Sequence, residues 1–219
     1  MVTNQLNDFV ESLNQTIPRN YEVINNIFNN QYGYPEFDPL RDEICKCIMC
    51  GLYQAAITLT NHLLETSLKK CLAMKYSIEH KEEITDLLCH LSKSLAEYDS
   101  KKLFETINEA YSCGLISEDQ KSKLHEFRMN IRNAYSHAES KKIFAGISAP
   151  AKAVSSSEYE KTEDLISDCF NGEYKDTEAK HLVPFHGIIQ AILSEDIAIP
   201  YFMEVDQIIR SMITKLKGD

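Results

Sequence analysis

The chain has 219 residues, of which 43 % are hydrophobic and 26 % are charged, and its formal net charge is −10 at pH 7. This composition is typical of globular proteins and excludes a disordered or fibrous chain, and the length is sufficient for one sizeable hydrophobic core. The negative net charge excludes a nonspecific nucleic-acid coat, because affinity for phosphate groups depends on Lys and Arg side chains that displace counterions.

The amino-terminal stretch lacks the basic start and the apolar run of a signal peptide, and no apolar run reaches the roughly 18 residues that a membrane-spanning helix needs. We therefore expect a cytoplasmic protein with no membrane attachment. In that compartment the seven cysteines are expected to be reduced thiols. Glycine and proline are scarce, at 7 and 6 residues, which favours an all-α fold.

In the first third of the chain, apolar residues at helical spacing predict two long helical regions. The first runs from residue 4 to 30, and Pro18 marks a break in it or the first turn of a second helix. The segment QYGYPEFDP is predicted to be a loop. Asp38, as N-cap with a proline directly after it, begins a long helix that should end near Ser77.

The middle of the chain carries clear helix boundaries. Residues 79–111 are predicted to form one interrupted helix or two shorter ones. Gly114 supplies a helix stop. Ser117 and Gln120 match a capping box, so the next helix should start there.

That next helix carries an unusual group of polar residues on its non-core side. Steps of about 100° per residue place Arg132 and His137 away from the core face, with Asn133 and Ser136 between them. The core face is predicted to consist of Leu124, Phe127, Ile131, Ala134, Tyr135 and Ala138. Residues 121–142 contain six basic and two acidic side chains, the reverse of the chain average, so this segment is where an anion is expected to bind.

The last third is less regular. The segment after Phe144 is rich in Ser and Ala and is predicted to be a loop or lid, followed by a weakly helical acidic stretch over 159–170 and another loop. Two final helices are predicted over 183–197 and 201–216, separated at Pro200.

The segment RNAYSH, from Arg132 to His137, resembles the Arg-(four to six residues)-His motif of the HEPN (higher eukaryotes and prokaryotes nucleotide-binding) superfamily. Asn133 is the polar residue that commonly follows the arginine in that family. The segments GLYQAAITLTNHLLETSLKKCL and GLISEDQKSKLHEFRMNIRNAYSH resemble the family's long second helix and the turn into its motif helix, and residues 201–216 resemble its closing helix.

The resemblance implies an all-α, HEPN-like antiparallel helical bundle with an additional helical and loop insertion before the last helix. The single domain would comprise four parts. These are an amino-terminal helical extension (1–37), the core helices (38–145), an insertion or lid (146–199) and a closing helix (200–219).

The resemblance also implies an activity, because catalytic HEPN proteins are metal-independent endoribonucleases that use the RNA 2′-hydroxyl as nucleophile. Such chemistry needs a group that titrates near neutral pH and a permanent cation. The implied catalytic residues are His137 as general acid and base, Arg132 as phosphate clamp and Asn133 as its orienting partner. Arg128, Ser136, Tyr135 and Lys141 are the implied substrate-binding residues.

The expected partners follow from the same resemblance. We expect RNA as substrate, a homodimer with one composite site at the subunit interface, and a toxin or phage-defence role with a neutralising or activating partner protein. No metal or other cofactor is expected. The alternative function is a noncatalytic HEPN module that binds a nucleotide or a protein, and the alternative interpretation of Arg132 and His137 is a solvated helix face.

Other residues allow further interpretations. Cys45, Cys47 and Cys50 could be zinc ligands, but their spacing on a helix favours core thiols. His181 and His186 could join a site under a lid or lie at the surface. Four lysines are expected to be solvated: Lys69, Lys70, Lys101 and Lys102. Glu65 could face the motif or form an ordinary surface salt bridge.

Overall fold

The computed structural model describes residues 2–80, 87–136, 143–151, 175–181 and 186–218. Over these residues the fold is all-α, as predicted, with one short two-stranded ribbon. The helices before the ribbon are α1 (Val2–Asn29), α2 (Asp38–Met49), α3 (Tyr53–Glu79), α4 (Leu87–Asp99), α5 (Leu103–Ser112), α6 (Glu118–Phe127) and α7 (Asn133–Ser136). Strands β1 (Ser148–Ala151) and β2 (Lys175–Glu178), a short 3-10 turn (Ala179–His181) and α10 (His186–Gly218) complete the described chain.

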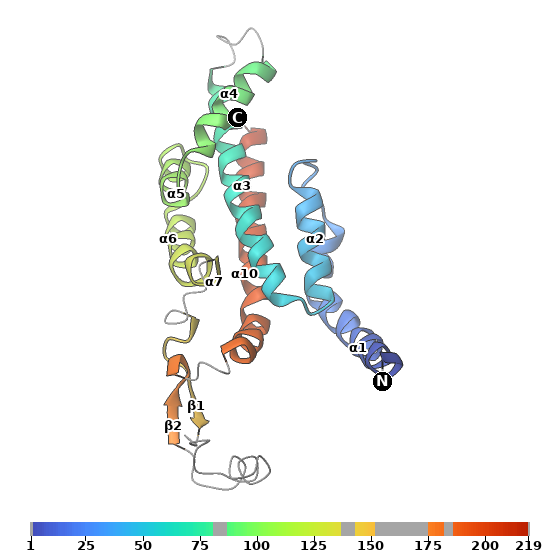
Figure 1. Ribbon diagram of the computed structural model, residues 1–219. Helices are drawn as coiled ribbons and strands as arrows, with labels where there is room; N and C mark the ends of the chain where they lie inside the picture. The colour runs from blue at the N-terminus through green and yellow to red at the C-terminus, as the bar shows by residue number, and fades with distance from the viewer. Residues whose placement is uncertain (1, 81–86, 137–142, 152–174, 182–185, 219) are drawn as a thin grey trace, which may run out of the picture.

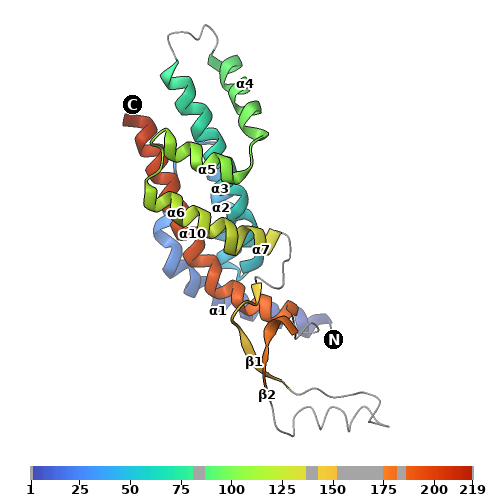
Figure 2. The ribbon, with the colours of Figure 1, turned by 90° about the vertical axis from the view of Figure 1, so that its left-hand side faces the viewer.

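Two long helices, α3 and α10, form the centre of the molecule. They pack side by side and run in the same direction, whereas α2 and α4 run antiparallel to α3 (Figures 1 and 2). Helices α1 and α2 lie on one side of this central pair, and α4 to α7 lie on the other (Figure 1). The hydrophobic core therefore lies along α3 and α10, where its fully buried members include Ile57, Leu64, Leu68, Phe202 and Ile209.

Helix α1 is continuous through Pro18, so the predicted break or restart there is wrong. Pro18 is exposed, and the backbone carbonyl that loses its donor can face water, which lets the helix continue. Only the second half of α1 is packed, through residues such as Ile24. In its first half Leu6, Phe9 and Val10 remain exposed, with 60 %, 57 % and 46 % of their surface accessible.

The helix predicted from Asp38 to Ser77 is in fact two helices, because the chain turns at Gly51. Gly51 has φ +73°, and its N–H donates to the Ile48 carbonyl while the Leu52 N–H donates to the Cys47 carbonyl at 2.8 Å. This pair of bonds is a Schellman motif, which ends helices at a left-handed residue. The apolar spacing continues across the turn, and for that reason the sequence pattern did not indicate it.

Asp38 also differs from its predicted role as an N-cap. It is the first residue of α2, and its carboxylate accepts hydrogen bonds from the backbone N–H groups of Tyr32 and Tyr34 at 2.7 and 2.9 Å. The carboxylate therefore fixes the preceding loop instead of the first helical turn.

In the middle of the chain, the predicted helix stop at Gly114 and the predicted helix start at Ser117 are confirmed, whereas Glu79, where the preceding helical stretch was predicted to begin, is the last residue of α3. Residues 87–112 form two shorter helices, and Gly114 ends the second with φ +79°. The Ser117 side chain accepts from the Gln120 N–H at 3.2 Å, and the Gln120 side chain accepts from the Ser117 N–H at 2.9 Å. This is the predicted capping box at the start of α6.

The last third differs from its prediction in two ways. Strands β1 and β2 pair antiparallel, from Ser148 opposite Glu178 to Ala151 opposite Lys175, where loops were expected. The pairing joins segments far apart in sequence, so local composition does not show it. Helix α10 is one continuous helix, whereas two were predicted, and Pro200 is accommodated at its exposed face in the same way as Pro18. The acidic stretch over 159–170 lies outside the described residues.

A second, smaller core lies at the base of the ribbon. Its buried members are Ala134 of α7, Ile143, Phe144 and Ala179. Tyr135 of α7 and Ile189 and Leu193 of α10 pack against it. We call this group the ribbon-base core. It joins α7, the ribbon and the first turns of α10 in one packing unit. We call α6, the turn over 128–132 and α7 together the motif helix.

Candidate functional site

The predicted motif lies on a helix that changes its winding. After α6, residues Arg128–Arg132 form a π-helical turn, and the Asn133 N–H donates to the Arg128 carbonyl five residues earlier. Such turns are uncommon and are found frequently at functional sites, because the wider turn changes where the following side chains project. Arg132 is the last residue of this turn, and Asn133 begins α7.

Arg132 reaches from this turn to the central helix α3. Its Nε donates to Glu65 Oε1 at 2.8 Å, and one of its terminal nitrogens donates to Asn133 Oδ1 at 3.3 Å. The side chains of Arg132 and Glu65 are 28 % and 27 % exposed. Arg132 is therefore outside the core, as predicted, but it is not a fully solvated side chain, since two neighbours hold its guanidinium in one orientation.

A buried polar pair lies one helical turn from Glu65. Tyr201 of α10 donates its hydroxyl hydrogen to Asn61 Oδ1 at 2.7 Å. Burial raises the pKa of Tyr201, the Glu65 carboxylate acts in the same direction and Arg132 opposes it. Phe127 of α6 packs edge-on against the Tyr201 ring, with centroids 5.0 Å apart. Tyr201 is thus a neutral hydrogen-bond donor at neutral pH, and it supports α3 close to Glu65.

The other predicted site residues are distributed as follows. Tyr135 is half-buried, and burial raises the pKa of its hydroxyl, which lies near Ser194 of α10. Ser136 is the last residue of α7. The predicted acid and base His137 and the predicted substrate-binding Lys141 lie outside the described residues. The structure therefore brings together Arg132 and Asn133 from the predicted set, and it adds Glu65, for which the sequence left open a position facing the motif or a surface salt bridge.

Arg128, also predicted to bind substrate, faces a different neighbour. Its guanidinium carbon lies 5.3 Å from the centroid of the Phe104 ring on α5. His125 packs on the same ring at 5.1 Å and its Nε2 lies 3.2 Å from Asn108 Oδ1. Burial lowers the pKa of His125, and the charges of Arg128 and Lys121 add to this effect. Arg128 therefore packs on α5, whereas Arg132 packs on α3.

A cavity of about 250 Å³ opens between α3 and α4, directly beside the Arg132–Glu65 pair. We call it the α3–α4 cavity. Its lining residues are His62, Glu65, Thr66, Lys69, Lys70, Leu95 and Asp99. Lys69 donates to the Asp99 backbone carbonyl at 3.2 Å and its side chain is 18 % exposed. It is therefore packed in the cavity wall, and the prediction that it is solvated is wrong. Sequence patterns missed this group because its members lie on two helices.

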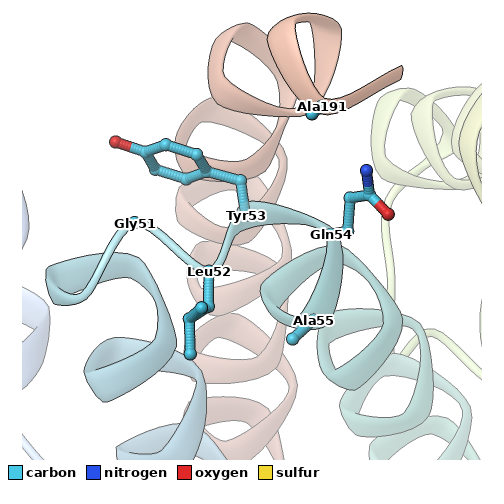
Figure 3. A pocket seen from close by; sticks show the side chains of 6 residues that line it. All are labelled: Gly51, Leu52, Tyr53, Gln54, Ala55 and Ala191. Atoms are coloured by element: carbon cyan, nitrogen blue, oxygen red, sulfur yellow. The ribbon is translucent and has the colours of Figure 1, made fainter. Parts of the chain in front are cut away.

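A second cavity lies at the turn between α2 and α3, and Figure 3 shows it with Ala191 of α10 above the turn. Its volume is about 350 Å³, and it is lined by Gly51, Leu52, Tyr53, Gln54, Ala55 and Ala191. None of these side chains carries a charge at neutral pH. The cavity therefore has no cation to hold a phosphate group, and the candidate site is the one at Arg132.

The remaining candidate ligands and site residues are the cysteines in and directly after α2 and the histidines His181 and His186. Cys45 is buried, as the core-thiol interpretation expects, and burial raises its pKa to about 12. Cys47 and Cys50 are half-buried. In the part of the chain that the structure describes, no three His, Cys, Asp or Glu side chains are arranged to hold a metal ion. His186 packs on Phe144 with centroids 4.4 Å apart, and His181 is exposed.

Comparisons with known proteins found no relative of the chain. No family model matches the chain, and neither a curated protein nor a solved structure matches it. Over the described residues, no helix combines the length and the apolar content that crossing a bilayer requires.

Proposed function

We propose that the chain is a metal-independent endoribonuclease of the HEPN type. The observation that supports this most is the fixed guanidinium of Arg132, which Glu65 and Asn133 orient at the end of a π-helical turn. A guanidinium held in advance stabilises developing negative charge without reorganising during the reaction. An oriented arginine on a locally basic helix suits a phosphate clamp in a protein of net charge −10.

The proposed reaction is transfer within the RNA strand. His137 accepts the proton of the 2′-hydroxyl, whose oxygen attacks the adjacent phosphorus, and the bond to the 5′-oxygen breaks as that oxygen takes up a proton. The products are a 2′,3′-cyclic phosphate and a free 5′-hydroxyl. Arg132 binds the phosphoryl oxygens as their charge grows, and Glu65 keeps the guanidinium in place. Arg128, Tyr135, Ser136 and Lys141 are the proposed contacts to the rest of the strand.

We further propose that two copies of the chain build the active site. One motif helix offers too small a polar surface to enclose a phosphodiester, whereas two copies related by a two-fold axis would form a cleft with two arginines and two histidines. The exposed apolar face of α1, with Leu6 and Phe9, is available for the contacts that offset repulsion between the basic segments. In the cytoplasm, such a nuclease is proposed to act as a toxin or defence effector that a partner protein controls.

The test is incubation of the purified chain with mixed RNA in excess EDTA. Cleavage that leaves 2′,3′-cyclic phosphate ends, and that Arg132→Ala and His137→Ala each abolish, is the expected result. Lys46→Ala is the matched control, because Lys46 is an exposed cation on α2, and α2 lies across the central helix pair from α7 (Figure 1). Binding of RNA without cleavage by the unchanged chain would instead favour a noncatalytic module.

The proposed dimer has its own test. Sedimentation at micromolar concentration should give a species near twice 25.1 kDa. Mixing Arg132→Ala chains with His137→Ala chains should restore part of the activity if the site is shared. A monomer that cleaves RNA at the full rate would contradict the shared site.

A further inference from the structure

The α3–α4 cavity continues the candidate site along one face of α3. Glu65, which holds Arg132, lines the cavity, and Lys69 and Lys70 line it one turn further along the helix. Four to five residues correspond to about 6–8 Å along a helix axis. This distance is comparable with the step between neighbouring phosphates of an extended single strand, so a strand clamped at Arg132 can place its next phosphate in the cavity.

The charges in the cavity favour an anion there. Two carboxylates line it, and both are already paired: Glu65 with Arg132 at 2.8 Å and Asp99 with Lys69 at 3.9 Å. Lys70 is half-buried and makes no salt bridge with any residue that the structure describes. His62, one turn before Glu65, adds an imidazole that can donate a hydrogen bond. Lys70 is therefore the cation that remains available to a ligand.

The cavity also has the volume and the lining for part of a nucleotide. Its volume of about 250 Å³ is below the roughly 300–1,000 Å³ of pockets that enclose a whole drug-sized ligand. Leu95 of α4 supplies an apolar wall, and Thr66 supplies a hydroxyl that can donate to or accept from a sugar or phosphate oxygen. A phosphate with its ribose fits this volume and this lining better than a complete dinucleotide does.

We propose that the α3–α4 cavity is a second phosphate-binding subsite, which holds the nucleotide next to the scissile phosphate of a single-stranded RNA through Lys70 and His62. The inference rests on the proposed function, because it places the scissile phosphate at Arg132. It goes beyond that function by assigning a path for the strand along α3 and by giving a role to side chains outside the motif helix.

The test uses a fluorescent, noncleavable 2′-O-methyl pentanucleotide, whose binding does not depend on catalysis. Lys70→Ala should weaken its binding about fivefold to tenfold and reduce the slope of log affinity against log salt by about 0.7, the contribution of one phosphate contact on a single strand. Lys46→Ala should change neither quantity. A 2′-O-methyl dinucleotide, which has a single phosphate and cannot fill both positions at once, should lose less affinity on Lys70→Ala than the pentanucleotide does.

The outcomes separate this inference from the proposed function. RNA cleavage together with equal pentanucleotide binding by Lys70→Ala and Lys46→Ala overturns the subsite and leaves the nuclease intact. Absence of cleavage together with the expected Lys70 effect overturns the nuclease and supports the subsite as part of a binding protein. If millimolar adenosine monophosphate displaces the pentanucleotide from the unchanged chain but not from Lys70→Ala, the cavity is a free-nucleotide site and the subsite is overturned. Absence of pentanucleotide binding by the unchanged chain would also overturn the subsite.

Discussion

Arg132 Nε and Glu65 Oε1 lie 2.8 Å apart, and this contact joins the motif helix to the central helix α3 across 67 positions of sequence. Charge-assisted hydrogen bonds of this kind fix geometry more than they add stability when both partners are partly exposed. The contact therefore matters chiefly for the direction in which the guanidinium points.

Substitution of Glu65 should affect activity more than stability. We expect Glu65→Gln to lower the rate of RNA cleavage about tenfold, equivalent to about 1.4 kcal/mol, because a neutral amide orients the guanidinium less firmly. The free energy of unfolding should fall by at most about 1 kcal/mol. Single-turnover cleavage and urea unfolding measure the two effects.

The matched control is Glu204→Gln. Glu204 of α10 pairs with Lys123 of the same motif helix at 2.7 Å, at a more exposed position. This variant should keep the cleavage rate. An equal loss of activity in both variants would show that any ion pair on this helix matters, and not the one at Arg132.

Loss of the buried Tyr201 hydroxyl should destabilise the fold. Tyr201→Phe leaves the Asn61 carbonyl oxygen without its donor, and we expect a loss of about 1–3 kcal/mol of unfolding free energy. Adding Asn61→Leu removes the unpaired amide and should recover a large part of this loss. Thermal and urea unfolding of Tyr201→Phe, Asn61→Leu and the double variant measure the coupling. Additive losses would indicate that the hydrogen bond is not what links the two positions.

His125 should make stability depend on pH. Its pKa is lowered below the ordinary 6.5, because the fold disfavours the charged imidazole. The free energy of unfolding is therefore greatest where His125 is neutral. It falls as the pH drops from about 6.5 toward the lower pKa of the folded state. His125→Gln, which can still hydrogen-bond to Asn108, should reduce the drop in melting temperature between about pH 7.5 and 5.5. An equal drop in the unchanged chain and in His125→Gln would contradict this role of His125.

Gly51 should not tolerate a side chain. Its φ of +73° is strained for other residues, and an added Cβ would lie 3.3 Å from Thr16 Cγ2. We expect Gly51→Ala to lower the free energy of unfolding by about 1–2 kcal/mol. Gly187→Ala, in the first turn of α10 where an added Cβ meets no atom within 4 Å, should be neutral or slightly stabilising. Equal effects on the melting temperature would contradict this account of the turn.

The sequence predicts those features whose causes are local. Ser117 and Gln120 act within one helical turn, and Gly114 needs only its own backbone freedom, so both were predicted correctly. Gly51 carries the same kind of local signal, but the apolar periodicity that runs across it hid the turn. The sequence predicts a helix boundary at Pro200, which lies inside α10, because the pattern does not show which side of a helix faces water.

The candidate site was predicted less completely, because its parts are distant in sequence. The position of Arg132 outside the core follows from helical stepping, but its fixed orientation depends on Glu65 and on the π-helical turn. The α3–α4 cavity depends on how α4 packs against α3, and a single-helix pattern assigned Lys69 to solvent.

The ribbon-base core has a consequence for how the molecule opens. Ala134 of α7 is buried in this small core with Phe144 and Ala179, and Tyr135 packs against both cores, while α6 belongs to the main core through Leu124. Small cooperative units open at lower free energy than the main core. The two ends of the motif segment therefore belong to different units of local unfolding. The amides of α7 should exchange their hydrogens together with those of the ribbon, and earlier than the amides near Leu124.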